Sequence, residues 1–292
     1  KDKVENLAWD QDRISEAVIT AENSDVVILC VGLDETLEGE EGDTGNSDAS
    51  GDKVDLHLPK VQEELIEKVT AVGKPTIVVL MAGSAIDLNY AQDNCNGILL
   101  VWYPGARGGR AIADLLFGKE SPSGKLPITF YKDLEGMPEF TDYSMKNRTY
   151  RYMEKEALYP FGYGLTYSDT CVTEAEVVGE VSAESDIMLK ATVKNNGTVD
   201  TDEVVQVYIK DLDSLLAVRN YSLCGFKRVS LKAGEEKSVE FTISNKAMNI
   251  VDEDGNRYIA GKHFRLFAGV SQPDTRSAEL TGHKPAEVEI AL

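Results

Sequence analysis

A dense group of acidic residues lies in one stretch of the chain, residues 33–59, directly after an apolar run. Its carboxylates are Asp34, Glu35, Glu38, Glu40, Glu41 and Asp43, and no Lys or Arg follows before Lys53. Like charges oppose one another's ionisation, so a carboxyl in such a cluster can keep its proton at a higher pH than a free Glu. A retained proton is what a general acid needs, although acidic loops are more often only solvated surface.

Helices and apolar strands alternate through the part of the chain that must position this loop. Residues 26–31 are apolar throughout, which is typical of a parallel strand covered on both faces. Helical spacing precedes them in Ile14, Ala17, Val18 and Ala21. Further strands are expected at 76–81, 98–102 and 128–131, and further helices at 59–73 and 110–117. This alternation predicts an α/β domain with an open, mostly parallel sheet and helices on both faces.

The hydrophobic period changes to two in the second half of the chain. Ile187, Leu189, Ala191 and Val193 alternate with polar neighbours, and residues 205–209, 239–243 and 264–268 repeat this pattern. Turn residues separate these runs, which predicts an all-β antiparallel sandwich of about seven strands with no helix. Residues 132–165, rich in Pro, Gly and Tyr, are interpreted as an ordered connection packed by aromatic side chains. We therefore expect an α/β domain over residues 1–165 and a sandwich over 166–292.

Charge and composition limit the partners of the chain. Its 292 residues have a formal net charge of −20 at pH 7, which repels nucleic acid and anionic membranes but not a neutral sugar. No apolar stretch approaches the roughly 20 residues that span a bilayer, and residues 1–12 are too polar for a signal peptide. The scattered cysteines, with Cys30 in an apolar run, predict buried free thiols and slightly favour a cytoplasmic over a secreted location.

The polar residues of this region could also belong to other kinds of site. In an open α/β sheet, ligands bind beyond the carboxyl ends of the strands, where the acidic loop begins. Its carboxylates would repel a nucleotide phosphate, whereas residues 104–110 offer glycines with Arg107 and Arg110 but match no phosphate-binding fingerprint. A calcium loop starting at Asn46 would place Gly51 correctly, but its last ligand would be His57 instead of Glu.

The remaining histidines give little support to a metal site. His57, His263 and His283 are far apart in sequence, and the last two fall in the predicted sandwich. This spacing disfavours a histidine-bound metal and a Ser-His-Asp triad. We expect no metal and no cofactor.

Several motifs, in one order along nearly the whole chain, resemble those of the family 3 glycoside hydrolases. In the α/β half they are residues 25–32 (DVVILCVG), 38–43 (EGEEGD), 56–59 (LHLP, with Gln62 and Leu65 after it), 102–105 (WYPG), 122–127 (PSGKLP) and 160–167 (PFGYGLTY). Residues 203–208 (EVVQVY), 225–229 (GFKRV) and 264–269 (FRLFAG) are similar to the fibronectin type III-like domain of the family.

The resemblance implies a retaining, exo-acting β-glycosidase made of three parts. A (β/α)8-type barrel supplies the aspartate nucleophile, an α/β sandwich domain supplies the glutamate acid/base, and a fibronectin type III-like domain follows. This chain resembles only the last two parts. The family's loop aligns with Glu40 at the acid/base position, with Glu38 and Glu41 as the nearest alternatives. The Asp-Arg pair that often follows is here Asp43-Thr44, with an insertion after it.

The implied partners are a β-linked xylo- or gluco-oligosaccharide of plant origin and the barrel domain, and a homo-oligomer is left open. Residues 142–152, together with 38–41, are more similar to the β-xylosidase branch than to the β-glucosidase branch. Two other classes of function stay open at this point. One is a non-catalytic carbohydrate-binding or interaction module, and the other is a nucleotide-binding α/β domain.

Overall fold

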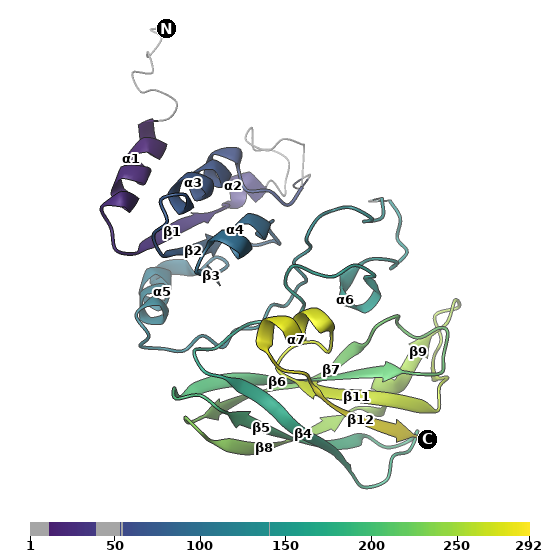
Figure 1. Cartoon of the computed structure of the whole chain (residues 1–292). Helices are drawn as coiled ribbons and strands as arrows, with labels where there is room; N and C mark the ends of the chain where they lie inside the picture. The colour runs from purple at the N-terminus through teal and green to yellow at the C-terminus, as the bar shows by residue number, and fades with distance from the viewer. Residues whose placement is uncertain (1–11, 39–52, 54, 140) are drawn as a thin grey trace. The chain divides into compact units, whose positions relative to one another are not determined.

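The computed structural model describes residues 12–38, 53, 55–139 and 141–292 (Figure 1). The chain divides into two compact units. The first comprises residues 1–112 with 132–134, and the second comprises residues 113–131 with 135–292. Residues 135–165 are thus grouped with the sandwich, and the expected division between residues 165 and 166 stays a prediction. Over the described ranges, no helix is long and apolar enough to cross a membrane.

A parallel sheet forms the centre of the first unit. Its strands are β1 (Val27–Gly32), β2 (Thr76–Met81) and β3 (Gly97–Leu100), with β2 in the middle. Helices flank it: α1 (Asp12–Glu22), α2 (Glu35–Glu38), α3 (Lys60–Thr70) and α4 (Asn89–Asn94), and η1 (Gly105–Arg107) and α5 (Gly108–Leu116) follow β3. The mostly apolar β2 is buried on both faces, since Val78, Val79 and Leu80 are each 0% exposed. The predicted parallel α/β domain is confirmed.

Cys30 differs from its prediction, because its thiol is exposed rather than buried. It lies on β1, which is an edge strand of the described sheet. The neighbouring alternate residue Ile28 is also 45% exposed, so this face of the edge strand is open in the first unit. An apolar sequence shows that a strand is suited to burial, but its place in the sheet decides whether both faces are covered.

The fourth strand expected at residues 128–131 does not join the sheet of the first unit. Phe130 forms an isolated antiparallel bridge with Tyr159. The amide of Phe130 donates to the carbonyl of Tyr159 at 3.0 Å, and the carbonyl of Phe130 accepts from the amide of Leu158 at 2.9 Å. Its backbone groups are therefore satisfied within the second unit, by the aromatic connection, and not by a parallel neighbour.

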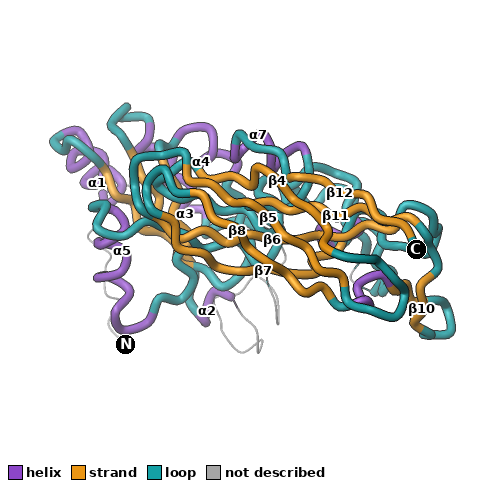
Figure 2. Tube along the Cα trace, turned by 90° about the horizontal axis from the view of Figure 1, so that it is seen from below, coloured by secondary structure: helices purple, strands orange, loops and turns teal. Residues whose placement is uncertain are grey.

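Two antiparallel sheets make up most of the second unit. One has the order β12-β11-β6-β7 and the other β4-β5-β8, and a short pair β9-β10 is added (Figures 1 and 2). The strands are β4 (Thr170–Val178), β5 (Ile187–Asn195), β6 (Thr201–Asp211), β7 (Ser222–Leu231), β8 (Glu236–Ile243), β9 (Asn249–Val251), β10 (Arg257–Ile259), β11 (His263–Gly269) and β12 (Ala286–Ala291). The predicted all-β sandwich is confirmed.

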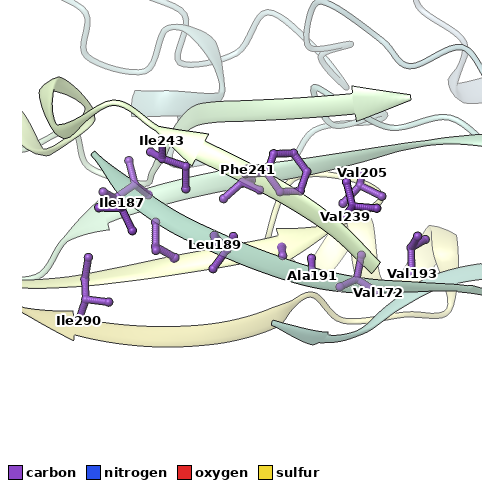
Figure 3. Close-up of a cluster of buried hydrophobic side chains, with 14 of the residues drawn as sticks. Val172, Ile187, Leu189, Ala191, Val193, Val205, Val239, Phe241, Ile243 and Ile290 are labelled. Carbon is purple, nitrogen blue, oxygen red and sulfur yellow. The ribbon is translucent and has the colours of Figure 1, made fainter. Parts of the chain in front are cut away.

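The side chains that alternate along the sandwich strands form its core (Figure 3). Ile187, Leu189, Ala191 and Val193 on β5 are at most 1% exposed, and Phe241 on β8 packs in the same cluster. Because successive side chains of a strand point to opposite faces, the period of two in the sequence becomes one buried face. This burial is what the alternating pattern predicted.

Aromatic rings pack the connection that precedes the sandwich. Tyr150, in the short helix α6 (Thr149–Tyr152), stacks on Phe161 with ring centroids 4.3 Å apart. It also meets Tyr208 and Tyr221 of the sandwich, and all three tyrosines are at most 8% exposed. Offset and edge-on aromatic pairs of this kind add to the free energy gained by burying the rings.

The prediction that the sandwich has no helix is wrong, because helix α7 (Thr275–Thr281) lies between β11 and β12. Asp274 caps its first turn, because the carboxylate accepts from the amide of Ser277 at 2.6 Å. Gly282 ends it with a left-handed φ of 77°. η2 (Asn245–Met248) is a second short helical turn of this unit, capped by Ser244. Asp and Ser are common at the start of helical turns, so both caps could have been predicted from the sequence. The regular spacing of the strands around them favoured an all-strand prediction instead.

Candidate functional site

The carboxyl ends of the three parallel strands lie along one edge of the sheet in the first unit. β1 ends at Gly32, β2 at Met81 and β3 at Leu100. Because the strands are parallel, the segments that leave them enter the same region, which is where open α/β sheets bind ligands. The acidic stretch begins at this edge, as its position after the first strand predicted.

One carboxylate, that of Glu38, joins the segments that follow all three strands. Its Oε1 accepts hydrogen bonds from the amide of Gly83 at 3.0 Å and from the hydroxyl of Tyr103 at 2.9 Å. Its Oε2 accepts from the hydroxyl of Ser84 at 3.0 Å, and the same hydroxyl lies 3.3 Å from Oε1. Gly83 and Ser84 follow β2 and Tyr103 follows β3, so a single side chain ties the edge together.

Glu38 is positioned by the short helix α2. Asp34 precedes the helix, and its Oδ1 accepts from the amide of Leu37 at 3.1 Å. The carbonyl of Asp34 accepts from the amide of Glu38 at 2.9 Å. Before it, the amide of Leu33 donates to the carbonyl of Met81 at 2.8 Å, which extends the pairing of β1 with β2 past the strand end. The chain therefore reaches Glu38 through a hydrogen-bonded path from β1.

Tyr103 reaches Glu38 from a turn with unusual backbone geometry. Trp102, the second residue after β3, has a left-handed φ of 51°, which is costly for a residue with a bulky side chain. A Cβ added to Gly83 would lie 2.6 Å from Cε2 of Tyr103, so the ring rests against the glycine backbone. Burial of the hydroxyl and, after it, the hydrogen bond to Glu38 raise the pKa of Tyr103 above its ordinary value.

Gly32 and Gln62 fix the point where the chain leaves β1. The amide of Gly32 donates to Oε1 of Gln62 at 2.8 Å, and Nε2 of Gln62 donates back to the carbonyl of Gly32 at 2.8 Å. Gly32 has a φ of 155°, and an added Cβ would lie 1.8 Å from the carbonyl oxygen of Met81. Only glycine fits there, so the start of the acidic stretch is held close against β2.

The residues predicted for the site are divided between the described and the undescribed parts of the chain. Glu40 and Glu41 lie outside the described residues, as do all the oxygen donors of the calcium alternative from Asn46 to Asp52. Glu38 is described, and the structure places it among Gly83, Ser84 and Tyr103. Sequence reasoning missed these three. The residues immediately after each apolar strand were the signal that could have found them.

The histidines are ordinary partners of carboxylates in three separate places. Nδ1 of His57 lies 2.8 Å from Oε1 of Glu63 on the surface, and this hydrogen bond raises the pKa of His57. His263 pairs with Asp213 at 3.1 Å, and His283 pairs with Asp169 at 2.5 Å. Within the described ranges, no group of three or more His, Cys, Asp or Glu could hold a metal ion. Arg107 ends η1, and Arg110 lies in the first turn of α5.

Comparison with known proteins identifies both units. Residues 1–167 match the glycosyl hydrolase family 3 C-terminal domain, and residues 203–272 match the fibronectin type III-like domain. The chain belongs to glycosyl hydrolase family 3. The resemblance stated from the motifs is thus confirmed for the α/β domain and for the sandwich of this family 3 chain.

Relatives of the family 3 chain include glycosidases with different substrates in their names. A xylan 1,4-beta-xylosidase of Xylanibacter ruminicola is 38% identical over 270 residues, which is 91% of this chain and 31% of the relative. An exo-alpha-(1->6)-L-arabinopyranosidase of Bifidobacterium longum is 34% identical, over 89% of this chain and 35% of the relative. A periplasmic beta-glucosidase of Salmonella typhimurium is 31% identical, over 89% and 34%.

Solved structures show the same arrangement of elements. The GH3 beta-glucosidase of Bifidobacterium adolescentis matches with a TM-score of 0.82 and 30% identity, covering 98% of this chain and 41% of that one. A beta-glucosidase of Erythrobacter marinus matches with a TM-score of 0.80 and 31% identity, covering 96% and 36%. The family 3 chain therefore spans about a third of the length of the curated relatives it matches.

Proposed function

We propose that this chain is the acid/base-bearing part of a retaining, exo-acting β-glycosidase whose nucleophile lies in a barrel domain. The observation that carries the proposal is the match of residues 1–167 to the family 3 C-terminal domain, in which the acidic stretch leaves the edge where α/β sheets bind ligands. Relatives about three times longer leave room for a barrel beside the part that this chain matches.

Glu40 is the acid/base in this proposal. In the first step it donates its proton to the glycosidic oxygen, while the bond from that oxygen to the anomeric carbon breaks and the barrel's aspartate bonds to that carbon. In the second step Glu40, now a carboxylate, takes a proton from the water that displaces the aspartate. The family alignment of the loop and the acidic neighbours Glu38, Glu41 and Asp43 support this choice.

The first prediction tests the division of labour between this chain and the barrel. The purified chain is expected to fold but not to hydrolyse aryl xylosides, glucosides or arabinopyranosides, because the partner carboxylate of the retaining mechanism is supplied by the barrel. The full-length parent protein is expected to hydrolyse at least one of them. Release of p-nitrophenol measures both, with circular dichroism as the control that the isolated chain is folded. Turnover by the isolated chain at about 1 s⁻¹ or faster, a rate normal for enzymes, would overturn the proposal.

The second prediction concerns the sugar. We expect the full-length protein to have a higher kcat/KM on an aryl β-D-xyloside than on the corresponding glucoside. Three relatives named as β-xylosidases, at 38%, 34% and 35% identity, support this preference over the beta-glucosidases at 31% to 33%. A pentose lacks the exocyclic hydroxymethyl group of a hexose, and bulk that fills this space rejects the larger sugar.

The measured sugar preference decides the substrate but does not change the proposed role of Glu40. A ratio that favours the glucoside tenfold or more, about 1.4 kcal/mol in transition-state binding, would assign a β-glucosidase and leave the role of Glu40 unchanged. An α-L-arabinopyranoside is the third arm, because one relative is named for that pentose. Preference for it would keep the pentose specificity and change only the configuration of the hydroxyl groups that the site recognises.

A further inference from the structure

Both oxygens of the Glu38 carboxylate are already engaged by donors of its own domain. Oε1 accepts from the Gly83 amide and the Tyr103 hydroxyl, and Oε2 accepts from the Ser84 hydroxyl, at 2.9–3.0 Å. A general acid must present a protonated oxygen to the glycosidic oxygen at hydrogen-bond distance. To donate a proton from Oε2, Glu38 would have to give up its bond to Ser84, and Oε1 is already held by Gly83 and Tyr103.

The donors are fixed by the sheet rather than by flexible loops. The Gly83 amide belongs to the backbone just past β2, and the Tyr103 ring rests on that same glycine with 2.6 Å between Cε2 and an added Cβ. The left-handed turn at Trp102 directs Tyr103 toward Glu38, and strained backbone of this kind persists where surrounding contacts hold it in place. The hydrogen-bonded cluster of Glu38, Gly83, Ser84 and Tyr103 is therefore a built feature of the sheet edge.

We propose that Glu38 is a positioning residue: its hydrogen bonds to Gly83, Ser84 and Tyr103 fasten the sheet edge at the point from which the chain continues to the acid/base. This inference rests on the proposed function of Glu40. Glu40 follows Glu38 by two positions, and two residues of extended chain span at most about 7 Å. Loss of the Glu38 contacts would release the point from which the chain continues to Glu40, and a misplacement of a reacting group by about 1 Å can cost roughly 10²-fold in rate.

The activity test compares Glu38→Ala, Glu38→Gln and Tyr103→Phe in the full-length enzyme. Because Glu38 acts through Glu40, its loss should slow substrates with poor leaving groups more than activated ones, as in Glu40→Ala, but by a smaller factor of up to about 10²-fold. Tyr103→Phe should give a smaller loss of the same kind. In the double variant Glu38→Ala/Tyr103→Phe the two losses should not add, because both variants remove the contact between Glu38 and Tyr103. Azide rescue of Glu38→Ala as strong as that of Glu40→Ala, or additive losses, would overturn the proposal.

Matched controls lie in the same unit. Tyr90→Phe removes an exposed hydroxyl that pairs with Thr70 at 3.1 Å, and Glu63→Gln neutralises an exposed carboxylate that pairs with His57 at 2.8 Å. Both should leave kcat unchanged. These controls show whether the enzyme is slowed only when a group of the Glu38 cluster is lost, or also when a tyrosine hydroxyl or a carboxylate elsewhere in the domain is lost.

A second measurement does not depend on activity. In this chain labelled with 13C-tyrosine, NMR titration should find the pKa of Tyr103 above the ordinary tyrosine value, and Glu38→Gln should lower it, because the charged acceptor is lost. An unchanged Tyr103 titration in Glu38→Gln would refute the contact and with it the proposal. If the titration shifts as expected but Glu40→Ala keeps full activity, the proposed function fails and the Glu38–Tyr103 contact stands.

Discussion

Replacing Glu40 by Ala in the full-length enzyme is expected to slow substrates with poor leaving groups by roughly 10² to 10⁴, the usual contribution of general acid catalysis, or about 2.7 to 5.4 kcal/mol. Activated aryl glycosides need little protonation of the departing oxygen and should lose less in the glycosylation step. Azide should partly restore turnover, because this anion attacks the glycosyl-enzyme without needing a base to remove a proton.

The measurement is a series of aryl glycosides with leaving groups of increasing pKa, assayed with and without azide. Glu41→Ala serves as the neighbouring carboxylate control and should give a milder loss without rescue. If Glu41→Ala or Glu38→Ala shows azide rescue and Glu40→Ala does not, the acid/base is the rescued residue and the alignment of the loop is displaced accordingly.

Replacing Glu203 by Ala is expected to destabilise the second unit by about 3 to 5 kcal/mol, because it leaves a buried ammonium without its counter-ion. Glu203 is 1% exposed. Its Oε1 accepts from Lys125 Nζ at 2.8 Å and from the amide of Val204 at 2.6 Å, and Oε2 accepts from the hydroxyl of Thr170 at 2.5 Å. Lys125 also donates to the carbonyl of Gly164 at 2.6 Å, and only 8% of its side chain is exposed.

Urea unfolding followed by near-ultraviolet circular dichroism of the buried tyrosines Tyr150, Tyr208 and Tyr221 reports on the second unit. Neither tryptophan, Trp9 or Trp102, falls in the sequence of the second unit, so tryptophan fluorescence serves as a control that does not come from that unit. The double variant Lys125→Met/Glu203→Leu should be much more stable than Glu203→Ala, since apolar residues of similar volume can replace a buried pair.

The matched control is the ion pair of Asp202, the residue that precedes Glu203 on β6. Asp202 meets Arg228 at 2.8 Å, with side chains 33% and 60% exposed, so Asp202→Ala should cost no more than about 1 kcal/mol. Equal losses for Asp202→Ala and Glu203→Ala would mean that burial does not decide the strength of these pairs. The contrast matters for the fold, because Lys125 lies in the turn motif 122–127, Gly164 in the connection and Glu203 on β6.

Local patterns predicted the classes of both domains. The apolar run at residues 77–81 forms most of the central strand β2, and the alternation from Ile187 to Val193 forms a buried face of β5. These features depend on how one short segment is covered, so the period of its side chains is enough to predict them. The order of the motifs along the chain predicted the family in the same way.

Contacts between distant segments required the tertiary structure. Residues 128–131 have the amino-acid types of a strand, but the backbone of Phe130 pairs with Tyr159 and not with the parallel sheet of the first unit. Lys125 lies in a turn motif, and no feature of the sequence around it predicts that it pairs with Glu203.

For the acidic stretch, too, the sequence and the tertiary structure supply different information. Its composition and its position after β1 predicted a candidate general acid, and the resemblance to the family named Glu40, with Glu38 and Glu41 as alternatives. The pairing register of the three parallel strands brings Gly83, Ser84 and Tyr103 to Glu38, and no sequence pattern predicted these contacts. Sequence periodicity records which face of a segment is buried, but hydrogen bonds between side chains depend on the three-dimensional course of the backbone, and that is set only when the strands pair.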